Sequence, residues 1–430
     1  MLKKEGIAME FNERIEKVHD IPLRAIIEAF GGTFIDGKQF THPSFGHEKT
    51  PSGFIYSKGS KEYFKHFKLD LGGDGIDFVK AVTGVNTTIE AINMILGDDK
   101  NIKLFTHEES QEYKRQLIEK EAERINKERK RMFAILKNSV PLLDSDIGVA
   151  YFQKRGIDIQ ALKLNDPNID IRVNSFKGKD GKIINNIVYF FNGNPKKNTH
   201  KFMILKGIDE NGNKNGVKLN LLTCRPVIHQ EEIGKPFVIC EGIEDSLSAQ
   251  ELGYKNFISL NSTSSINKLI TTMNTCRKWF TKNSFELCLD NDVAGKHAMN
   301  KLKIFCNLAD NNFDNIKSFI REEILNCKDD KKLNLIKSTL KLLNNIKDLK
   351  EVDSNILIEV INNLTKLLPE DYFKDFGSTF KIKESECYGI MNELGYNDLN
   401  DLLVKEYKAD FKEVIEQIFD NDYKPNEIAR

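Results

Sequence analysis

Two short apolar runs in the second half of the chain each end at a cluster of acidic residues. Residues 237–240 are followed by Glu241-Gly242-Ile243-Glu244-Asp245, and residues 285–289 are followed by Asp290-Asn291-Asp292-Val293-Ala294-Gly295. Short apolar runs that stop at a carboxylate and open into a helical pattern predict parallel strands of an α/β sheet. The ligand crevice of such a sheet lies outside the carboxyl ends of its strands. We therefore expect Glu241, Asp290 and Asp292 to converge at one rim.

The carboxylates at this rim would repel one another unless a hard cation lay between them. Mg²⁺, or Mn²⁺ in its place, suits an all-oxygen site that keeps waters and shares its remaining positions with phosphates. We expect Glu241 and Asp290 to be primary ligands, Asp292 to lie beside them, and Asp245 to bind the ion or orient its ligands. The alternative for the Asp-x-Asp element is a plain turn or helix cap. Two acidic clusters, each at the end of a predicted strand, favour a metal site for phosphate chemistry on nucleic acid.

The rest of the chain divides by pattern into further segments. Residues 1–100 combine short helices with a glycine- and aromatic-rich stretch of small strands, and residues 101–140 form a charged helical linker. Residues 141–234 begin with a helix that ends in glycine and continue as a hairpin and another strand. Residues 235–306 hold the acidic clusters, residues 307–394 form a Lys-, Asn- and Leu-rich helical insertion, and residues 395–430 follow it. The pattern predicts a multidomain fold with α/β and α+β parts.

Composition and cysteine usage narrow the classes of function. Lys+Arg and Asp+Glu both number 64 among 430 residues, so the net charge is zero and the chain is not a strongly basic nucleic-acid binder. The seven cysteines include no Cys-x-x-Cys pair, which supports neither a disulfide framework nor a cysteine zinc site. No signal peptide and no membrane-spanning apolar run is evident, so we expect a cytoplasmic protein without a membrane partner.

The two acidic clusters carry a resemblance to a known family. A Glu-Gly-x-x-Asp element followed by Asp-x-Asp-x-Ala-Gly resembles the Toprim domain of bacterial DnaG-type primases, topoisomerases and some nucleases. The stretch from Glu241 to Ala249 is most similar to primases of plasmids, phages and integrative elements. The resemblance implies a parallel-sheet Toprim domain, with Glu241, Asp290 and Asp292 as catalytic residues. In the Toprim nucleases and topoisomerases the glutamate of this element is also proposed as a general acid or base, and Glu241 is the matching residue here.

The first segment resembles the N-terminal zinc-binding domain of the same primases. The resemblance lies in His47-Glu48-Lys49-Thr50-Pro51-Ser52, in residues 63–67 and in Gly72-Gly73-Asp74-Gly75. Every cysteine of that family's zinc site is missing here, so we expect a zinc-ribbon-like domain that keeps its shape and has lost its metal. A residual site would have to use His42, His47, His66 and Asp70.

The family's zinc-binding domain binds template DNA, which suggests a role for a run of basic residues in this segment. Tyr63, Phe64 and Phe67 are interleaved with lysines, and such a pattern suits the stacking of bases and the contact of phosphates in a single strand. The alternative is a half-buried strand with one solvated face. The candidate contacts are Lys61, Lys65 and Lys68.

Two further segments resemble parts of the primase polymerase domain. Residues 151–157 resemble the element that begins this domain, whose basic lobe faces the metal site, so Lys201, Lys206 and Arg225 become candidates for template or nucleotide phosphate contacts. Asp398 and Asp401 match the spacing of an acidic segment that supplies further metal ligands in related primases. The alternative for Asp398 is that it only caps a helix beginning near Leu399.

The resemblance implies a DNA primase: a DNA-directed RNA polymerase that joins nucleoside triphosphates on a single-stranded DNA template, in replication of a mobile element or phage. The sequence has no Gly-x-x-x-x-Gly-Lys-Ser/Thr element, so a replicative helicase would come from another protein and could dock on the helical insertion. One alternative is a Toprim-type nuclease that uses the same carboxylates. The other is a non-catalytic accessory protein that binds single-stranded DNA.

Overall fold

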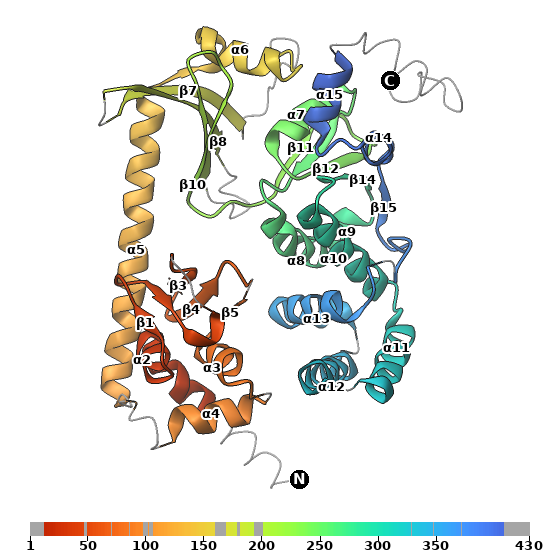
Figure 1. The fold of residues 1–430 in the computed structure, drawn as a ribbon. Coiled ribbons are helices and arrows are strands. Elements are labelled where there is room, and N and C mark those ends of the chain that lie inside the picture. The colour runs from red at the N-terminus through yellow and green to blue at the C-terminus, as the bar shows by residue number, and fades with distance from the viewer. Residues whose placement is uncertain are drawn as a thin grey trace. The chain divides into compact units, whose positions relative to one another are not determined.

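The computed structural model describes residues 13–46, 50–69, 71–85, 87–97, 102, 106–159, 169–178, 181–192, 201–327, 329–346, 348–370 and 372–407. These residues belong to two compact units, one from residues 1–127 and 326–335 and the other from residues 128–325 and 336–430 (Figure 1). Along the described residues, no helix combines the length and the apolar character needed to cross a bilayer.

The first unit is a small antiparallel sheet with helices packed on it. Its five strands follow chain order: β1 (Thr33–Phe34), β2 (Gln39–Thr41), β3 (Gly53–Lys58), β4 (Lys61–His66) and β5 (Leu71–Gly73). The helices are α2 (Leu23–Ala29), α3 (Gly75–Thr83) and α4 (Thr88–Leu96). The sequence fixes the starts of α3 and α4 because Asp74 and Thr87 each form a capping box.

An aromatic cluster forms the core of this unit. Phe78 of α3 is fully buried and packs edge-to-face against Phe40, Phe45 and Phe64, with ring centroids 5.4–6.2 Å apart. Such pairs add to the stabilisation that the burial of their apolar area provides. The core of the first unit is therefore built from apolar side chains.

The second unit begins in the last turns of α5 (His107–Lys137) and continues into an antiparallel sheet. Met132 of α5 is buried against Val188, Met203 and Leu221 of this sheet. The strand order is β10 (Lys214–Leu221), β9 (Phe202–Ile208), β8 (Ile183–Phe191), β7 (Ile169–Lys177) and β6 (Ser139–Pro141). Helix α6 (Asp146–Lys154) follows β6 in the chain, with the short helix η3 (Leu142–Asp144) between them. The sequence predicted the β7–β8 hairpin and strand β9 but missed β10.

The third sheet carries the two acidic clusters. Its order is β11 (Val227–Gln230), β13 (Asn256–Ser259), β12 (Phe237–Cys240), β14 (Ser284–Cys288) and β15 (Lys381–Glu384). The pairs β13–β12, β12–β14 and β14–β15 are parallel, whereas β11 pairs with β13 antiparallel. Strands β12 and β13 are buried along their whole length, which explains the apolar sequence of β12 and the apolar centre of β13.

Helices cover both faces of this third sheet (Figure 1). On one side α7 (Ile243–Glu251) packs with α15 (Leu399–Tyr407), which also contacts α14 (Glu386–Leu394). On the other side α10 (Val293–Ala309) packs with α8 (Ile266–Thr275) and α13 (Ser354–Leu367). The remaining helices are α9 (Arg277–Phe280), α11 (Phe313–Asn326) and α12 (Asp330–Asn345).

The expected insertion at residues 307–394 is helical only in part. Helices α11, α12 and α13 occupy its first portion, but residues 381–384 form β15, which joins the third sheet beside β14. Asp310 fixes the return of the chain, because its carboxylate accepts the N–H groups of Ser378 and Thr379. The sequence did not indicate β15 because a four-residue edge strand, exposed at three of its positions, has no apolar run.

Candidate metal and phosphate site

The first acidic cluster lies where β12 ends and α7 begins. Glu241 follows the last strand residue, and Asp245 reaches back so that its Oδ2 accepts the backbone N–H of Gly242 at 3.0 Å. A Cβ at Gly242 would lie 2.6 Å from that oxygen, which explains why glycine stands at this position. Asp245 therefore accepts the N–H of the N-cap residue of α7 and is also a candidate ligand.

The second acidic cluster connects β14 to α10. Asp290 follows the strand, and Asp292 is the N-cap of α10, with its Oδ1 accepting the N–H of Gly295 at 2.7 Å. A Cβ at Gly295 would come within 2.0 Å of the carbonyl oxygen of Asp290, so the first turn of α10 requires glycine there. The Asp-x-Asp element is thus a helix cap and also directs Asp290 to the end of the sheet.

A third segment brings Asp398 to the same place. The N–H of Asn291 donates to the carbonyl of Asn397 at 2.6 Å and joins the β14–α10 loop to the stretch before α15. Asp398 Oδ1 accepts the N–H of Asp401 at 2.6 Å, as a capping residue does. Its carboxylate nevertheless lines the same cavity as Asp245 and Asp290. Capping and a place at the site are therefore compatible for Asp398.

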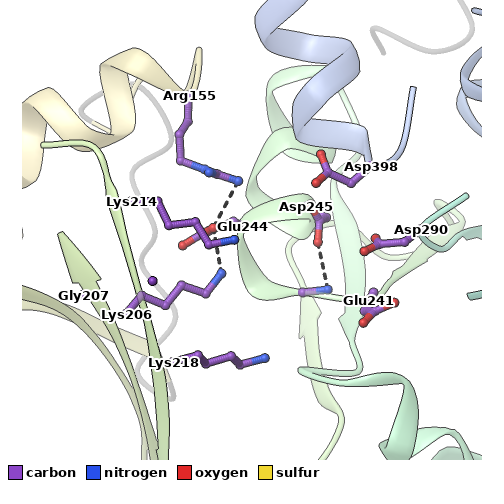
Figure 2. Close-up of a pocket in the computed structure, with 12 residues that line it drawn as sticks. Arg155, Lys206, Gly207, Lys214, Lys218, Glu241, Glu244, Asp245, Asp290 and Asp398 are labelled. Atoms are coloured by element: carbon purple, nitrogen blue, oxygen red, sulfur yellow. Dashed lines mark hydrogen bonds and ion pairs between the residues drawn. The ribbon is translucent and has the colours of Figure 1, made fainter. Parts of the chain in front are cut away.

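These carboxylates border a cavity of about 260 Å³ in the second unit (Figure 2). The acidic side is contributed by Glu241, Asp245, Asp290 and Asp398, and the opposite side by cations from the antiparallel sheet and α6. Figure 2 shows the two groups facing each other across α7. The cations that line the cavity are Arg155, Lys206, Lys214 and Lys218.

The electrostatics of the acidic side disfavour its fully charged form. Burial, followed by the charges of Asp292 and Asp245, raises the pKa of Glu241 to about 7. Burial and the neighbouring carboxylates also raise the pKa of Asp290, and burial together with Asp398 raises that of Asp245. The cause is the crowding of like charges in a partly desolvated space, which a cation would relieve.

The carboxylate oxygens of the acidic side are suitable ligands for a hard divalent cation, although they do not yet surround a common point. One of them, Oε2 of Glu241, is buried and accepts no hydrogen bond within the described residues. Within that same part of the chain, no three acidic, histidine or cysteine side chains lie close enough together to hold an ion as they stand. Binding would therefore require small rotations of the carboxylates toward one another. Glu241, Asp290, Asp245 and Asp398 would hold the ion.

The cationic side also contains a buried carboxylate, that of Glu244, which pairs with two of the four cations. It is 2% exposed and lies between two tyrosines and two of the four cations. Tyr151 and Tyr189 donate their hydroxyls to its Oε1 at 2.8 and 2.6 Å. Lys206 and Arg155 lie 2.7 and 3.1 Å from its Oε2. Burial alone would raise the pKa of Glu244, but these two cations hold it down to about 2.

The other two cations of the cavity make no ion pair with any described residue. Lys218 Nζ donates to the carbonyl of Asn261 at 2.9 Å, and Lys214 extends into the cavity (Figure 2). Burial and the neighbouring Lys206 lower the pKa of Lys218, since both oppose its positive charge. A bound polyphosphate would give these lysines a negatively charged partner.

Several candidates from the sequence lie away from this cavity. Lys201 is exposed and its Nζ lies 6.0 Å from the ring centroid of Phe190, and Arg225 is exposed on the loop before β11. Asp401 lies in the first turn of α15 with its carboxylate 3.9 Å from Lys405. Of the three basic candidates in this region, only Lys206 lines the cavity, and it is paired with Glu244.

The basic candidates of the first unit lie on or just after β4. Lys61 and Lys65 are partly exposed and Lys68 is exposed, so their positions allow contact with a strand of nucleic acid. Phe67 is 69% exposed, whereas Phe64 is 1% exposed and belongs to the core. The alternation on β4 therefore has one buried face and one solvated face, and Phe64 cannot stack on a base.

Two of the histidines proposed for a residual zinc site, His42 and His66, are buried in the first unit. His42 uses both ring nitrogens for the backbone, with Nε2 2.7 Å from the carbonyl of Phe30 and Nδ1 accepting the N–H of Ser44. The buried His66 accepts the N–H of Leu69 through Nδ1 at 3.3 Å. Both rings pack against Phe45, at 5.4 and 4.7 Å. His47 and Asp70 lie outside the described residues.

Sequence reasoning missed Arg155, Lys214, Lys218 and the role of Glu244. The signal for Glu244 was its position inside the acidic cluster, one residue before Asp245. Lys214 and Lys218 were missed together with β10, because this strand has alternating polar residues and glycine rather than an apolar run.

Comparison with protein families identifies residues 238–330 as Toprim-like. The second unit thus contains a Toprim-like domain, and its sheet extends beyond the matched segment to β15. A Toprim domain implies divalent-metal binding and a function in nucleic-acid processing, as in primases, nucleases and topoisomerases. Neither curated proteins nor solved structures provide a match.

Proposed function

We propose that this chain is a DNA primase that makes short primers on single-stranded DNA by metal-dependent nucleotidyl transfer, in replication of a mobile element or phage. The observation that carries the proposal is the cavity in which Toprim-like carboxylates face cations from a separate antiparallel sheet. A polymerising enzyme must hold a metal ion and a triphosphate side by side. The two sides of this cavity offer the ligands for each.

The carboxylates of the cavity would bind the metal ion, and the lysines that pair with no described carboxylate would bind the triphosphate. Glu241 and Asp290 would hold the ion, with Asp245 and Asp398 completing or orienting its ligands. The bound ion would lower the pKa of the attacking 3′-hydroxyl and neutralise charge on the triphosphate. Lys214 and Lys218 would contact the phosphates, because neither is paired with a carboxylate of the described residues. The cation-lined side favours synthesis over hydrolysis, since a nuclease has no triphosphate to hold.

The first unit supplies a surface suited to the template. Tyr56 and Tyr63 stack on neighbouring strands with ring centroids 5.8 Å apart, and Tyr56 is 41% exposed. Lys61 and Lys65 belong to the same hairpin. Exposed aromatic rings and lysines together bind single strands by stacking and phosphate contact.

The test is primer synthesis on single-stranded DNA with labelled nucleoside triphosphates and Mg²⁺ or Mn²⁺. Asp290→Asn is the inactivating variant, and Asp314→Asn, an exposed carboxylate on α11, is its matched control. Short labelled products from the wild type and from Asp314→Asn, but not from Asp290→Asn, would support the proposal. Metal-dependent cutting of the template without products would establish the nuclease instead. Template binding with neither activity would leave a single-strand-binding accessory role.

A further inference from the structure

The buried carboxylate of Glu244 lies among the cations on one side of the cavity. It lies on α7 directly before Asp245, but the two side chains diverge (Figure 2). Glu244 extends toward Arg155 and Lys206, whereas Asp245 extends toward Asp290 and Asp398. We propose that Glu244 is a positioning residue, which holds Arg155 and Lys206 on the cationic side and so keeps the metal-binding carboxylates free of them. The inference rests on the proposed function, because it presumes that these carboxylates bind a metal ion.

The contacts of Glu244 account for both of its oxygens. One oxygen takes two tyrosine hydroxyls and the other takes two cations, all within 3.1 Å. Tyr189 is 0% exposed, Tyr151 is 1% exposed and Glu244 is 2% exposed, so water competes little for these contacts. A buried ion pair is stable while both partners are present. Removal of one partner leaves the charge of the other buried and unneutralised.

The two cations have another carboxylate within electrostatic reach. Lys206, Arg155 and Asp245 all line the same cavity, and Asp245 directly follows Glu244 on α7. Without the negative charge of Glu244, Asp245 is the next carboxylate along the same helix. A lysine or arginine that neutralised Asp245 would compete with a divalent cation for the same oxygens.

The pairing of Glu244 with Arg155 and Lys206 leaves two other lysines of the cavity unpaired among the described residues. Lys214 and Lys218 line the cavity and form no ion pair with the described residues. Glu244 therefore pairs with two of the four cations, Arg155 and Lys206. The charges of the other two, Lys214 and Lys218, remain available to a ligand. The acidic side then meets an incoming metal ion with its carboxylates unpaired.

The test measures Mn²⁺ affinity of the full chain, from the electron paramagnetic resonance signal of free Mn²⁺. Glu244→Gln keeps the shape of the side chain and removes its charge, and we expect Mn²⁺ to bind about tenfold more weakly. The double variant Glu244→Gln/Lys206→Gln also removes the released cation and should bind within about twofold of the wild type. Tyr151→Phe/Tyr189→Phe, which loosens the same cluster without releasing a charge, should leave the affinity unchanged.

The outcomes separate this inference from the proposed function. Equal weakening in Glu244→Gln and in the double variant, or in the tyrosine pair, would mean a structural role and overturn the inference. Mn²⁺ binding that Asp290→Asn abolishes but Glu244→Gln leaves unchanged would overturn the inference alone. Binding that Asp290→Asn leaves unchanged would overturn both.

A fallback covers the case in which Glu244→Gln does not fold, as judged by circular dichroism. The same comparison is then made between Glu244→Gln/Arg155→Gln, which leaves Lys206 as the single released cation, and the triple variant that also carries Lys206→Gln. Weak binding in the first and restored binding in the second support the inference. Equal affinities in the two variants overturn it.

Discussion

Replacement of Gly295 by alanine should damage both the fold and the site. The new Cβ would lie 2.0 Å from the carbonyl oxygen of Asp290, and ordinary contact begins at 3.4 Å, so the carbonyl or the start of α10 must move by the difference of 1.4 Å. Overpacking of this kind costs about 1–3 kcal/mol, more than the 0.5–1 kcal/mol that alanine gains over glycine in a helix. We expect a net loss of about 1–2 kcal/mol in the free energy of unfolding.

The same displacement should be more harmful to activity than to stability. The backbone that must move is that of Asp290, and a misplacement of about 1 Å in a catalytic group can cost about a hundredfold in rate. Urea unfolding and primer synthesis would be measured side by side. The control is Gly389→Ala on α14, where a Cβ meets nothing within 4 Å and should stabilise the fold by about 0.5–1 kcal/mol. A Gly295→Ala protein with wild-type stability and activity would refute the close approach on which the reasoning depends.

Three further predictions follow from the histidines, the pKa values and α15. A zinc chelator should leave the melting temperature unchanged, because His42 uses both ring nitrogens for the backbone; a melting temperature lowered by the chelator would contradict this. Mn²⁺ affinity should rise between about pH 6 and pH 8, because the raised pKa values of Glu241 and Asp290 let protons compete with the ion below that range; a titration with a flat profile would argue against it. Asp398→Asn should weaken Mn²⁺ binding severalfold in a calorimetric titration, whereas Asp401→Asn, whose carboxylate lies outside the cavity, should not.

The acidic side of the site was predictable because its information is local in the sequence. Residues 237–240 are all buried and run directly into Glu241, and a mostly buried strand, β14, precedes Asp290 with only Leu289 between them. A strand that is buried on both faces has to be apolar throughout, and the carboxyl ends of neighbouring parallel strands share one edge. The expectation that Glu241 and Asp290 lie together required no more than these two rules.

The cationic side was not predictable because its contacts join distant segments. Tyr151 and Tyr189 reach Glu244 from positions 93 and 55 residues earlier in the chain. Tyr151 belongs to the resemblance at residues 151–157, but neither that resemblance nor the pattern around Tyr189 indicates a contact with Glu244. Lys206 shows the same limit: the sequence suggested it as a contact for phosphates, but it does not reveal that Glu244 matches its charge.

The sequence suggested that an acidic residue either caps a helix or binds a metal ion, but the two roles are compatible in one residue. Asp245, Asp292 and Asp398 each accept a backbone N–H at the start of a helix. A capping bond occupies one carboxylate oxygen and also fixes the side chain at the helix N-terminus, where the partial positive charge favours an anion. Helices α7 and α10 begin at the carboxyl ends of β12 and β14, and the bond from Asn291 to Asn397 holds the start of α15 beside them, so the capping carboxylates are directed to the same edge as Glu241 and Asp290. The capping bonds therefore restrain the carboxylates that would otherwise have to be ordered when a metal ion binds.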